Sequence, residues 1–168
     1  NNKILTKGFS IGFVGRDYPH KNTVIFPQIK KNLLAKYSID VDFYVTLSDE
    51  EWQLKSEDFR RVINNVGVLS VAQCPSFYKE MDAVIFPSLL ECFSATPLEA
   101  MAMGKPLFAS DRDFVRDVCG NYALYFDPMN PDSAADIIAW YIRNRAGCDQ
   151  SLLSDARQYA ESFSNAKQ

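Results

Sequence analysis

The chain has 168 residues, of which 47% are apolar and 23% are charged, and 18 basic against 21 acidic side chains give it a net charge of −3. This length suits a single domain, residues 1–168, that can bury a core of its own. The weakly negative charge and the lack of a long basic stripe argue against nucleic acid as a partner. No apolar run approaches the roughly 20 residues that a membrane span requires.

We predict strands at six short segments, because each is a nearly continuous apolar run, which is typical of parallel strands covered on both faces. In chain order they are residues 9–14, 41–47, 66–70, Ala83–Phe86, 106–109 and 123–126. Helical periodicity predicts helices at residues 24–37, 49–63, 133–143 and 152–163. The alternation predicts an α/β fold, a Rossmann-like, doubly wound parallel sheet of about six strands with helices on both faces.

The loop after the first predicted strand reads GRDYPHKN and carries two cations, Arg16 and Lys21. Doubly wound folds bind ligands at the carboxyl ends of their strands. Gly15 permits a tight departure from the strand, and Asn22 is a candidate cap for the following helix. Two cations beside free helix N–H groups suit a phosphate, although the loop by itself favours a solvated basic loop with His20 at the surface.

The strand Ala83–Phe86 leads into a second loop. Two carboxylates eight positions apart, Glu91 and Glu99, stand at the two ends of this loop. Thr96, Pro97 and Glu99 match a capping box, with Thr96 as the N-cap and Glu99 at the third helical position. A role in its own helix therefore accounts for Glu99. Glu91 matches no such local role, so we expect it either at the solvated rim or facing a polar ligand.

Between the two acids, Phe93, Ser94 and Ala95 offer backbone N–H groups directly before a helix that we expect to end at Gly104. The helix dipole and these donors suit a diphosphate. The loop thus combines acids for hydroxyl groups at its ends with donors for phosphates in its middle.

Four cysteines and one histidine are spread singly along the chain. They are Cys74, Cys92, Cys119, Cys148 and His20. Because no C-x-x-C pair occurs and His20 has no nearby ligand partner, we expect no metal site. Isolated cysteines fit a reducing cytoplasm better than a disulfide scaffold.

Three consecutive segments resemble the signature of one enzyme family. They are DAVIFPS at residues 82–88, the E-x7-E pattern from Glu91 to Glu99, and the EAMAMGKP that begins at Glu99. Together they look like the signature of retaining glycosyltransferases of family 4, also called the glycosyltransferase group 1 family. FVGRDYPHKN is similar to that family's G-R-x(n)-K-N/G phosphate loop, and ASDRDFVRDVCGNYALYFDP is similar to its stretch after the next strand, so the resemblance covers residues 9–163.

The resemblance implies that the chain is the C-terminal, donor-binding half of a GT-B fold. Arg16 and Lys21 match the basic pair that contacts the donor diphosphate and stabilises the departing nucleotide, which fixed cations do without a metal. Glu91 matches the acid that faces the donor sugar. Glu99 matches the acid that holds ribose hydroxyls, since one carboxylate accepts from two hydroxyls at once.

Candidate site residues follow from this match. The catalytic candidates are Glu91, Arg16 and Lys21, and the donor-binding candidates are Gly15, Arg16, Lys21, Phe93, Ser94, Ala95, Thr96 and Glu99. The segment from Phe93 to Thr96 matches the loop whose backbone amides approach sugar and phosphate, and no metal or cofactor is implied. The chain departs from the family at Cys92 and Ser94, where glycines are common and a Cβ narrows the approach, and at Arg116-Asp117, which replaces a P-E pair.

The resemblance also implies a larger enzyme. We expect the chain, which does not open with methionine, to be a fragment without its N-terminal acceptor domain, able to bind donor but inactive alone. The full-length protein would be a hexosyltransferase of polysaccharide biosynthesis that moves a sugar from a nucleotide-diphosphate sugar to a glycan or lipid-linked acceptor. Its location would be cytoplasmic, with peripheral membrane contact if the acceptor is lipid-linked.

Other functions remain open. A nucleotide-sugar epimerase shares the architecture, but its chemistry needs further acids and a histidine, and His20 is the only histidine. A flavodoxin-like or response-receiver binding module needs acids where Arg16 and Lys21 stand. A non-catalytic glycosyltransferase is compatible with Cys92 and Ser94. The loops match neither a P-loop nor a G-x-G-x-x-G fingerprint, which disfavours a Walker-type ATPase and a nicotinamide dehydrogenase.

Overall fold

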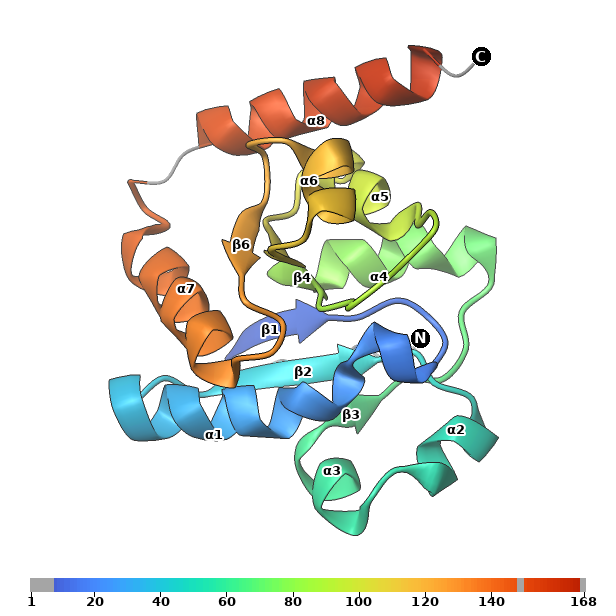
Figure 1. The fold of residues 1–168 in the computed structure, drawn as a ribbon, viewed down its shortest axis with the longest axis vertical. Coiled ribbons are helices and arrows are strands. Elements are labelled where there is room, and N and C mark those ends of the chain that lie inside the picture. The colour runs from blue at the N-terminus through green and yellow to red at the C-terminus, as the bar shows by residue number, and fades with distance from the viewer. Residues whose placement is uncertain (1–7, 148–149, 167–168) are drawn as a thin grey trace.

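The computed structural model describes residues 8–147 and 150–166, whose strands form one parallel sheet (Figure 1). The strands are β1 (Phe9–Gly12), β2 (Val41–Val45), β3 (Asn64–Asn65), β4 (Ala83–Phe86), β5 (Leu107–Ser110) and β6 (Leu124–Phe126), in the spatial order β3-β2-β1-β4-β5-β6. Each neighbouring pair is parallel. The strand order switches direction between β1 and β4, so the loops after these strands flank the crevice where doubly wound folds bind ligands.

Helices cover both faces of the sheet. On one face pack α1 (Phe26–Tyr37), α3 (Glu57–Val62) and α7 (Pro131–Asn144), and on the other α4 (Cys74–Glu80), α5 (Thr96–Ala102), α6 (Asp113–Cys119) and α8 (Gln150–Ala166). The short helix α2 (Asp49–Leu54) lies with α3 beside the β3 edge (Figure 1). Short 3₁₀ turns at Pro19–Lys21, Thr23–Ile25 and Val71–Gln73 precede α1 and α4. The predicted Rossmann-like α/β fold is confirmed.

The central strand β4 separates two apolar cores. Ala83 and Ile85 belong to the core beneath α1 and α7, whereas Val84 and Phe86 belong to the core beneath α4 and α5, because successive side chains of a strand point to opposite faces. All four are at most 4% exposed. The continuous apolar run that predicted this strand is therefore explained by burial on both faces.

The strand predicted at residues 66–70 is wrong. The edge strand β3 is confined to two asparagines, and Val66 adds one further backbone hydrogen bond, donated to the carbonyl oxygen of Val45 at 2.9 Å. The chain then turns away at Gly67, whose φ of 84° suits glycine. In this segment Val66 and Leu69 pack partly against the core beneath α4 and α5, whereas Val68 is exposed.

The helix predicted at residues 49–63 is two helices. The hydroxyl of Ser48 accepts a hydrogen bond from the Glu51 N–H at the start of α2, and the hydroxyl of Ser56 accepts one from the Phe59 N–H at the start of α3. Each serine caps its own helix, and the chain is extended between them. The sequence pattern did not predict α4 and α6.

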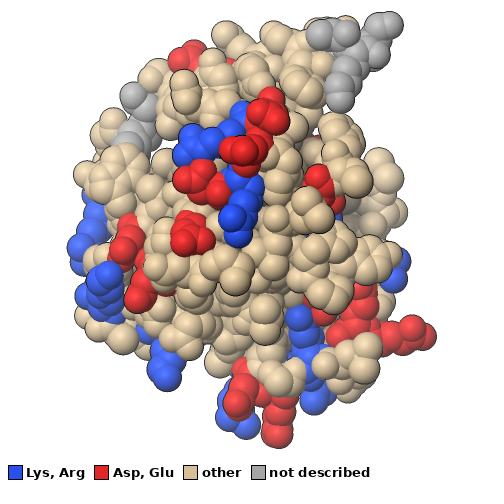
Figure 2. All heavy atoms as spheres, in the orientation of Figure 1, with Lys and Arg blue, Asp and Glu red and all other residues tan. Residues whose placement is uncertain are grey.

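The surface carries charges of both signs. Figure 2 shows acidic and basic side chains interspersed over one face, without a continuous basic area there. A polyanion binds best where basic residues gather on one surface, so this face offers no such site. Within the part of the chain that the structure describes, no helix combines the length and the apolar composition needed to cross a membrane.

Candidate functional site

The loops after β1 and β4 touch at the carboxyl edge of the sheet. The Leu89 N–H donates a hydrogen bond of 2.8 Å to the carbonyl oxygen of His20. The buried side chain of Asn22 donates from Nδ2 to the carbonyl oxygens of Pro87 (3.1 Å) and Pro128 (2.9 Å). The prediction that Asn22 caps a helix is therefore wrong, because its amide joins three loops instead.

Lys21 and Glu91 form the centre of the site. The Lys21 ammonium makes an ion pair with Oε1 of Glu91, and the two side chains are only 15% and 10% exposed. The same oxygen lies 3.7 Å from Nε2 of His20 and accepts a hydrogen bond of 3.4 Å from the Ser88 hydroxyl. Of the two places expected for Glu91, the solvated rim is wrong, because the loop after β1 folds over its side chain, and the expectation that it faces a polar ligand stays a prediction. The structure thus joins one predicted cation to one predicted acid.

Arg16 has a different partner. Its Nε lies 3.3 Å from Oε1 of Glu51 on α2, and its side chain is 60% exposed. The preceding Gly15 donates its N–H to the Thr46 hydroxyl at 3.1 Å. A Cβ at Gly15 would lie 3.2 Å from the Phe13 ring, and its φ of 157° is one that other residues rarely adopt. The predicted tight departure from the strand therefore requires glycine here.

The start of α5 differs from the predicted capping box. Ala95 occupies the N-cap position with helical backbone angles, and no side chain caps the helix. The Thr96 hydroxyl instead donates a hydrogen bond of 3.5 Å to the carbonyl oxygen of Val14, just after β1. The Thr96 N–H donates to the Ser94 hydroxyl at 3.4 Å. The capping box is therefore wrong, and the start of α5 is tied to the first loop.

Glu99 is oriented by the neighbouring helix α4. The Tyr78 hydroxyl donates a hydrogen bond of 2.9 Å to Oε2 of Glu99. Burial, followed by the nearby Glu99 charge, raises the pKa of Tyr78 far above its ordinary value, so the hydroxyl keeps its proton and donates. A hollow of about 270 Å³ between α4 and α5 is lined by Cys74, Tyr78, Glu99 and Met103. Glu99 therefore faces a hollow and does not cap its own helix.

The two positions that depart from glycine fit their loop without strain. Within residues 8–147 and 150–166, a positive φ outside glycine occurs only at Asn22 and Ser38, so Cys92 and Ser94 have ordinary backbone angles. A small hollow of about 30 Å³ beside Glu91 is lined in part by these two residues, which is room for about one water molecule. Their side chains narrow the space beside Glu91 and leave the backbone undistorted.

The structure offers no preformed metal centre in the residues it describes. No group of three His, Cys, Asp or Glu side chains there lies close enough to hold an ion. Cys74, Cys92 and Cys119 are free thiols, whereas Cys148 lies outside the described residues. The expectation that the site works without a metal stays a prediction.

Three side chains that support the site were not predicted, Glu51, Lys55 and Tyr78. Glu51 had a signal, because the S-x-x-E sequence that begins at Ser48 is a capping-box signature directly after a predicted strand. Lys55 and Tyr78 had none. The partners of Lys55 are Asp17 and Thr23, and the partner of Tyr78 is Glu99. All three lie on other elements, so only the packing of the fold brings them to the site.

Solved structures share the fold. The chain aligns with sucrose-phosphate synthase from Thermosynechococcus elongatus at a TM-score of 0.75 and 19% identity, covering 93% of this chain and 41% of that one. It aligns with the C-terminal domain of the glycosyl transferase group 1 family protein LpcC from Francisella tularensis at a TM-score of 0.69 and 22% identity, covering 95% and 85%. These likenesses show the fold of a glycosyltransferase domain.

The chain matches the family model of glycosyl transferases group 1 over residues 1–163, and it belongs to that family. It is 30% identical over 125 residues to the O-antigen chain mannosyltransferase RfbU of Salmonella typhimurium, covering 71% of this chain and 35% of that protein. It is 31% identical over 77 residues to the O-antigen biosynthesis glycosyltransferase WclY of Escherichia coli, covering 46% and 22%. The matches thus span about a third or less of these relatives' length.

Proposed function

We propose that the chain is the donor-binding half of a retaining, family 4 glycosyltransferase. The full-length enzyme moves a hexose from a nucleotide-diphosphate sugar to a glycan or lipid-linked acceptor, which an N-terminal domain outside this chain binds. The chain alone binds donor without turning it over. Two relatives named for O-antigen synthesis support a role in polysaccharide biosynthesis, and we place the full-length protein in the cytoplasm, with peripheral membrane contact where the acceptor is lipid-linked.

The observation that carries this proposal is the ion pair of Lys21 and Glu91 at the switch point between β1 and β4. A nucleotide-sugar donor supplies what each partner binds, because its phosphates suit the ammonium and its sugar hydroxyls suit the carboxylate. The family membership of the chain supports the same assignment.

The chemistry follows from the positions of the charges. When the bond between sugar and phosphate breaks, negative charge develops on the departing nucleoside diphosphate, and Arg16 and Lys21 stabilise it. Glu91 faces the sugar. Oε1 of Glu99 accepts hydrogen bonds from the ribose hydroxyl groups, while Oε2 accepts the hydrogen bond that the Tyr78 hydroxyl donates. The remaining donor contacts come from Gly15 and from the loop of Phe93, Ser94, Ala95 and Thr96, and we propose that no metal or cofactor takes part.

Calorimetry with UDP, GDP and ADP tests the donor site in the 168-residue chain. We expect one of the three to bind, and Lys21→Ala to weaken that binding about tenfold or more, because a charged hydrogen bond to phosphate is lost. Lys31→Ala is the matched control, since Lys31 is exposed on α1 away from the loops and its loss removes the same charge. Its affinity should equal that of the wild type.

The result that overturns the proposal is the absence of binding for all three nucleotides, both in this chain and in the full-length protein. For the full-length protein, the anomeric configuration of the product, read by NMR, tests retention. An inverted product would contradict the retaining mechanism and leave the donor site in place.

A further inference from the structure

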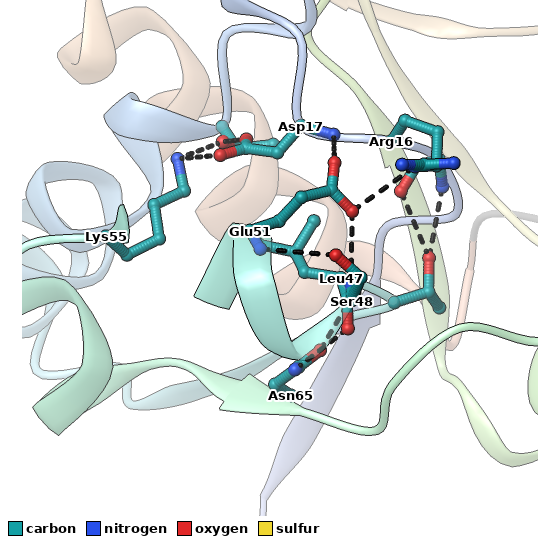
Figure 3. Close-up of polar contacts among 10 residues, drawn as sticks. Arg16, Asp17, Leu47, Ser48, Glu51, Lys55 and Asn65 are labelled. Atoms are coloured by element: carbon teal, nitrogen blue, oxygen red, sulfur yellow. Dashed lines mark hydrogen bonds and ion pairs between the residues drawn. The ribbon is translucent and has the colours of Figure 1, made fainter. Parts of the chain in front are cut away.

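Two charged side chains, Glu51 on α2 and Lys55 directly after it, reach the loop after β1 (Figure 3). We propose that these two residues, the α2 clamp, hold the phosphate loop (residues 15–22) in the conformation that receives the donor diphosphate, and that Glu51 is a positioning residue for Arg16. The proposal rests on the donor-binding function proposed above. It adds to the site a helix that lies outside both ligand loops.

The Glu51 carboxylate serves two loops at once. Its Oε1 accepts a hydrogen bond from the Ser48 N–H at 3.0 Å, and the Ser48 hydroxyl accepts one from the Glu51 N–H at 3.2 Å, which completes a capping box. Oε2 also accepts from the Asp17 N–H at 2.5 Å, and Oε1 lies 3.3 Å from Nε of Arg16. A capping box needs only the first two bonds, so the contacts to the phosphate loop are additional.

Glu51 is charged at neutral pH. Partial burial raises its pKa, but the N–H groups of Asp17 and Ser48, the Ser48 hydroxyl and the Arg16 charge together bring the pKa below its ordinary value. The carboxylate therefore holds Arg16 by Nε, and among the described residues it is the one acid paired with this arginine. The two Nη nitrogens of Arg16 are left for a bidentate contact with phosphate oxygens.

Lys55 removes an electrostatic obstacle from the same loop. Asp17 places a negative charge where phosphates are proposed to bind, and like charges repel. Lys55 Nζ lies 2.9 Å from Oδ2 of Asp17 and donates a hydrogen bond of 2.7 Å to the Thr23 hydroxyl, which in turn donates to Oδ1 of Asp17 at 2.5 Å. Both charged side chains are at most 15% exposed. The lysine thus neutralises Asp17 and keeps its carboxylate turned to α2.

The base of the clamp is fixed to the sheet. The Asn65 side chain of β3 accepts a hydrogen bond from the Leu47 N–H (2.9 Å) and donates one to the Leu47 carbonyl oxygen (3.0 Å). One residue earlier, the Thr46 hydroxyl accepts from the Gly15 N–H. Figure 3 shows Leu47, Ser48 and Glu51 in sequence between Asn65 and the phosphate loop. Supporting side chains locked in this way keep a binding site in one geometry.

Calorimetry with the 168-residue chain and the nucleoside diphosphate that it binds best tests the clamp. We expect Glu51→Gln to weaken binding about tenfold, through loss of a charged hydrogen-bond network. If only the net charge of the site mattered, Glu51→Gln would strengthen binding, because it removes a negative charge near the phosphates. In an Arg16→Ala background, the same change should have at most about a threefold effect, since most of it acts through Arg16.

Ser48→Ala is the matched control, because it removes the other half of the capping box and leaves the carboxylate. We expect it to lower the melting temperature and to keep the affinity within about twofold of wild type. Lys55→Met should weaken binding, and adding Asp17→Asn should restore it, because the unpaired charge is then removed.

Equal weakening by Ser48→Ala and Glu51→Gln would reduce Glu51 to a helix cap and overturn the proposal. Unchanged or tighter binding in Glu51→Gln would also overturn it, while leaving the donor function in place. A wild-type chain and a full-length protein that bind none of UDP, GDP and ADP would overturn the donor function, and the clamp with it.

Discussion

The hydroxyl of Tyr78 donates a hydrogen bond of 2.9 Å to Oε2 of Glu99 and so joins α4 to the first turn of α5. Tyr78 is buried whereas the loop before α5 is largely exposed. The contact therefore orients the acid from a rigid helix and leaves Oε1 for a ligand. The acid proposed to bind ribose is positioned by its neighbour and not by its own helix terminus.

Tyr78→Phe should weaken binding of a ribonucleoside diphosphate about fivefold, because one hydrogen bond to a charged group is lost. If Glu99 binds the ribose hydroxyls, a 2′,3′-dideoxy analogue should show no such loss. Calorimetry with both ligands makes the comparison. Tyr125→Phe is the control, since that hydroxyl donates to the Gly120 carbonyl oxygen at 2.6 Å, away from both loops. An equal loss for the two ligands would contradict the ribose role.

Glu91→Gln should separate donor binding from turnover. The change releases Lys21 from its ion pair, so the affinity for a nucleoside diphosphate without sugar should rise. In the full-length enzyme, kcat should fall by about 100-fold or more, because the acid that faces the sugar is lost. Calorimetry and a glycosyl-transfer assay give the two values.

The control for these two measurements is Glu80→Gln, at the exposed end of α4. It should change neither the affinity for the nucleoside diphosphate nor kcat. Unchanged kcat in Glu91→Gln would remove Glu91 from the reaction, and weaker binding of the nucleoside diphosphate would show that the ion pair builds the phosphate site instead of competing with it.

Asn22→Ala should lower the free energy of unfolding by about 2–4 kcal/mol, because two buried carbonyl oxygens lose their donor and alanine must adopt a left-handed backbone. The φ of Asn22 is 64°. Asn22→Gly relieves the backbone but not the lost hydrogen bonds, so it should fall between alanine and wild type. Denaturant titration measures all three. Asn32→Ala, which removes an exposed hydrogen bond to Asp132, should cost less than about 0.5 kcal/mol.

The stability of the protein should depend on pH through Glu51. Its pKa in the folded chain lies below the ordinary value of 4.5, so its contribution is fully present above the pKa of the unfolded chain and is lost as pH falls through the folded value. The gap in unfolding free energy between wild type and Glu51→Gln should therefore be larger at about pH 7 than at about pH 3. A gap that stays constant would show that the carboxylate is not stabilised by folding.

The sequence determined most of the sheet and the edge of the sheet at which the candidate site lies. A parallel strand buried on both faces has to be apolar at every position, and β4 was predicted from that pattern with its observed bounds. The end of α5 was also predicted, because Gly104 adopts a φ of 69° that glycine favours. These features depend on a residue and its near neighbours, so the sequence pattern was enough. The sequence also placed both loops at the carboxyl edge, because all strands of a parallel sheet end at that edge, whereas the strand order that brings the two loops into contact was not predicted.

The tertiary structure decided which side chains meet. From local sequence, Glu99 and Asn22 were expected to cap helices, and Glu91 had no local role. In the structure, Glu99 instead accepts a hydrogen bond from Tyr78, Asn22 joins three loops, and Glu91 pairs with Lys21. Arg16 likewise pairs with a glutamate 35 positions later on a helix that the pattern did not separate. Each partner comes from a different loop or helix, and the distance between them depends on strand register and helix packing. A sequence pattern indicates which residues follow a strand at the carboxyl edge of the sheet. The hydrogen bonds among these residues depend on the strand order and helix packing of the complete fold.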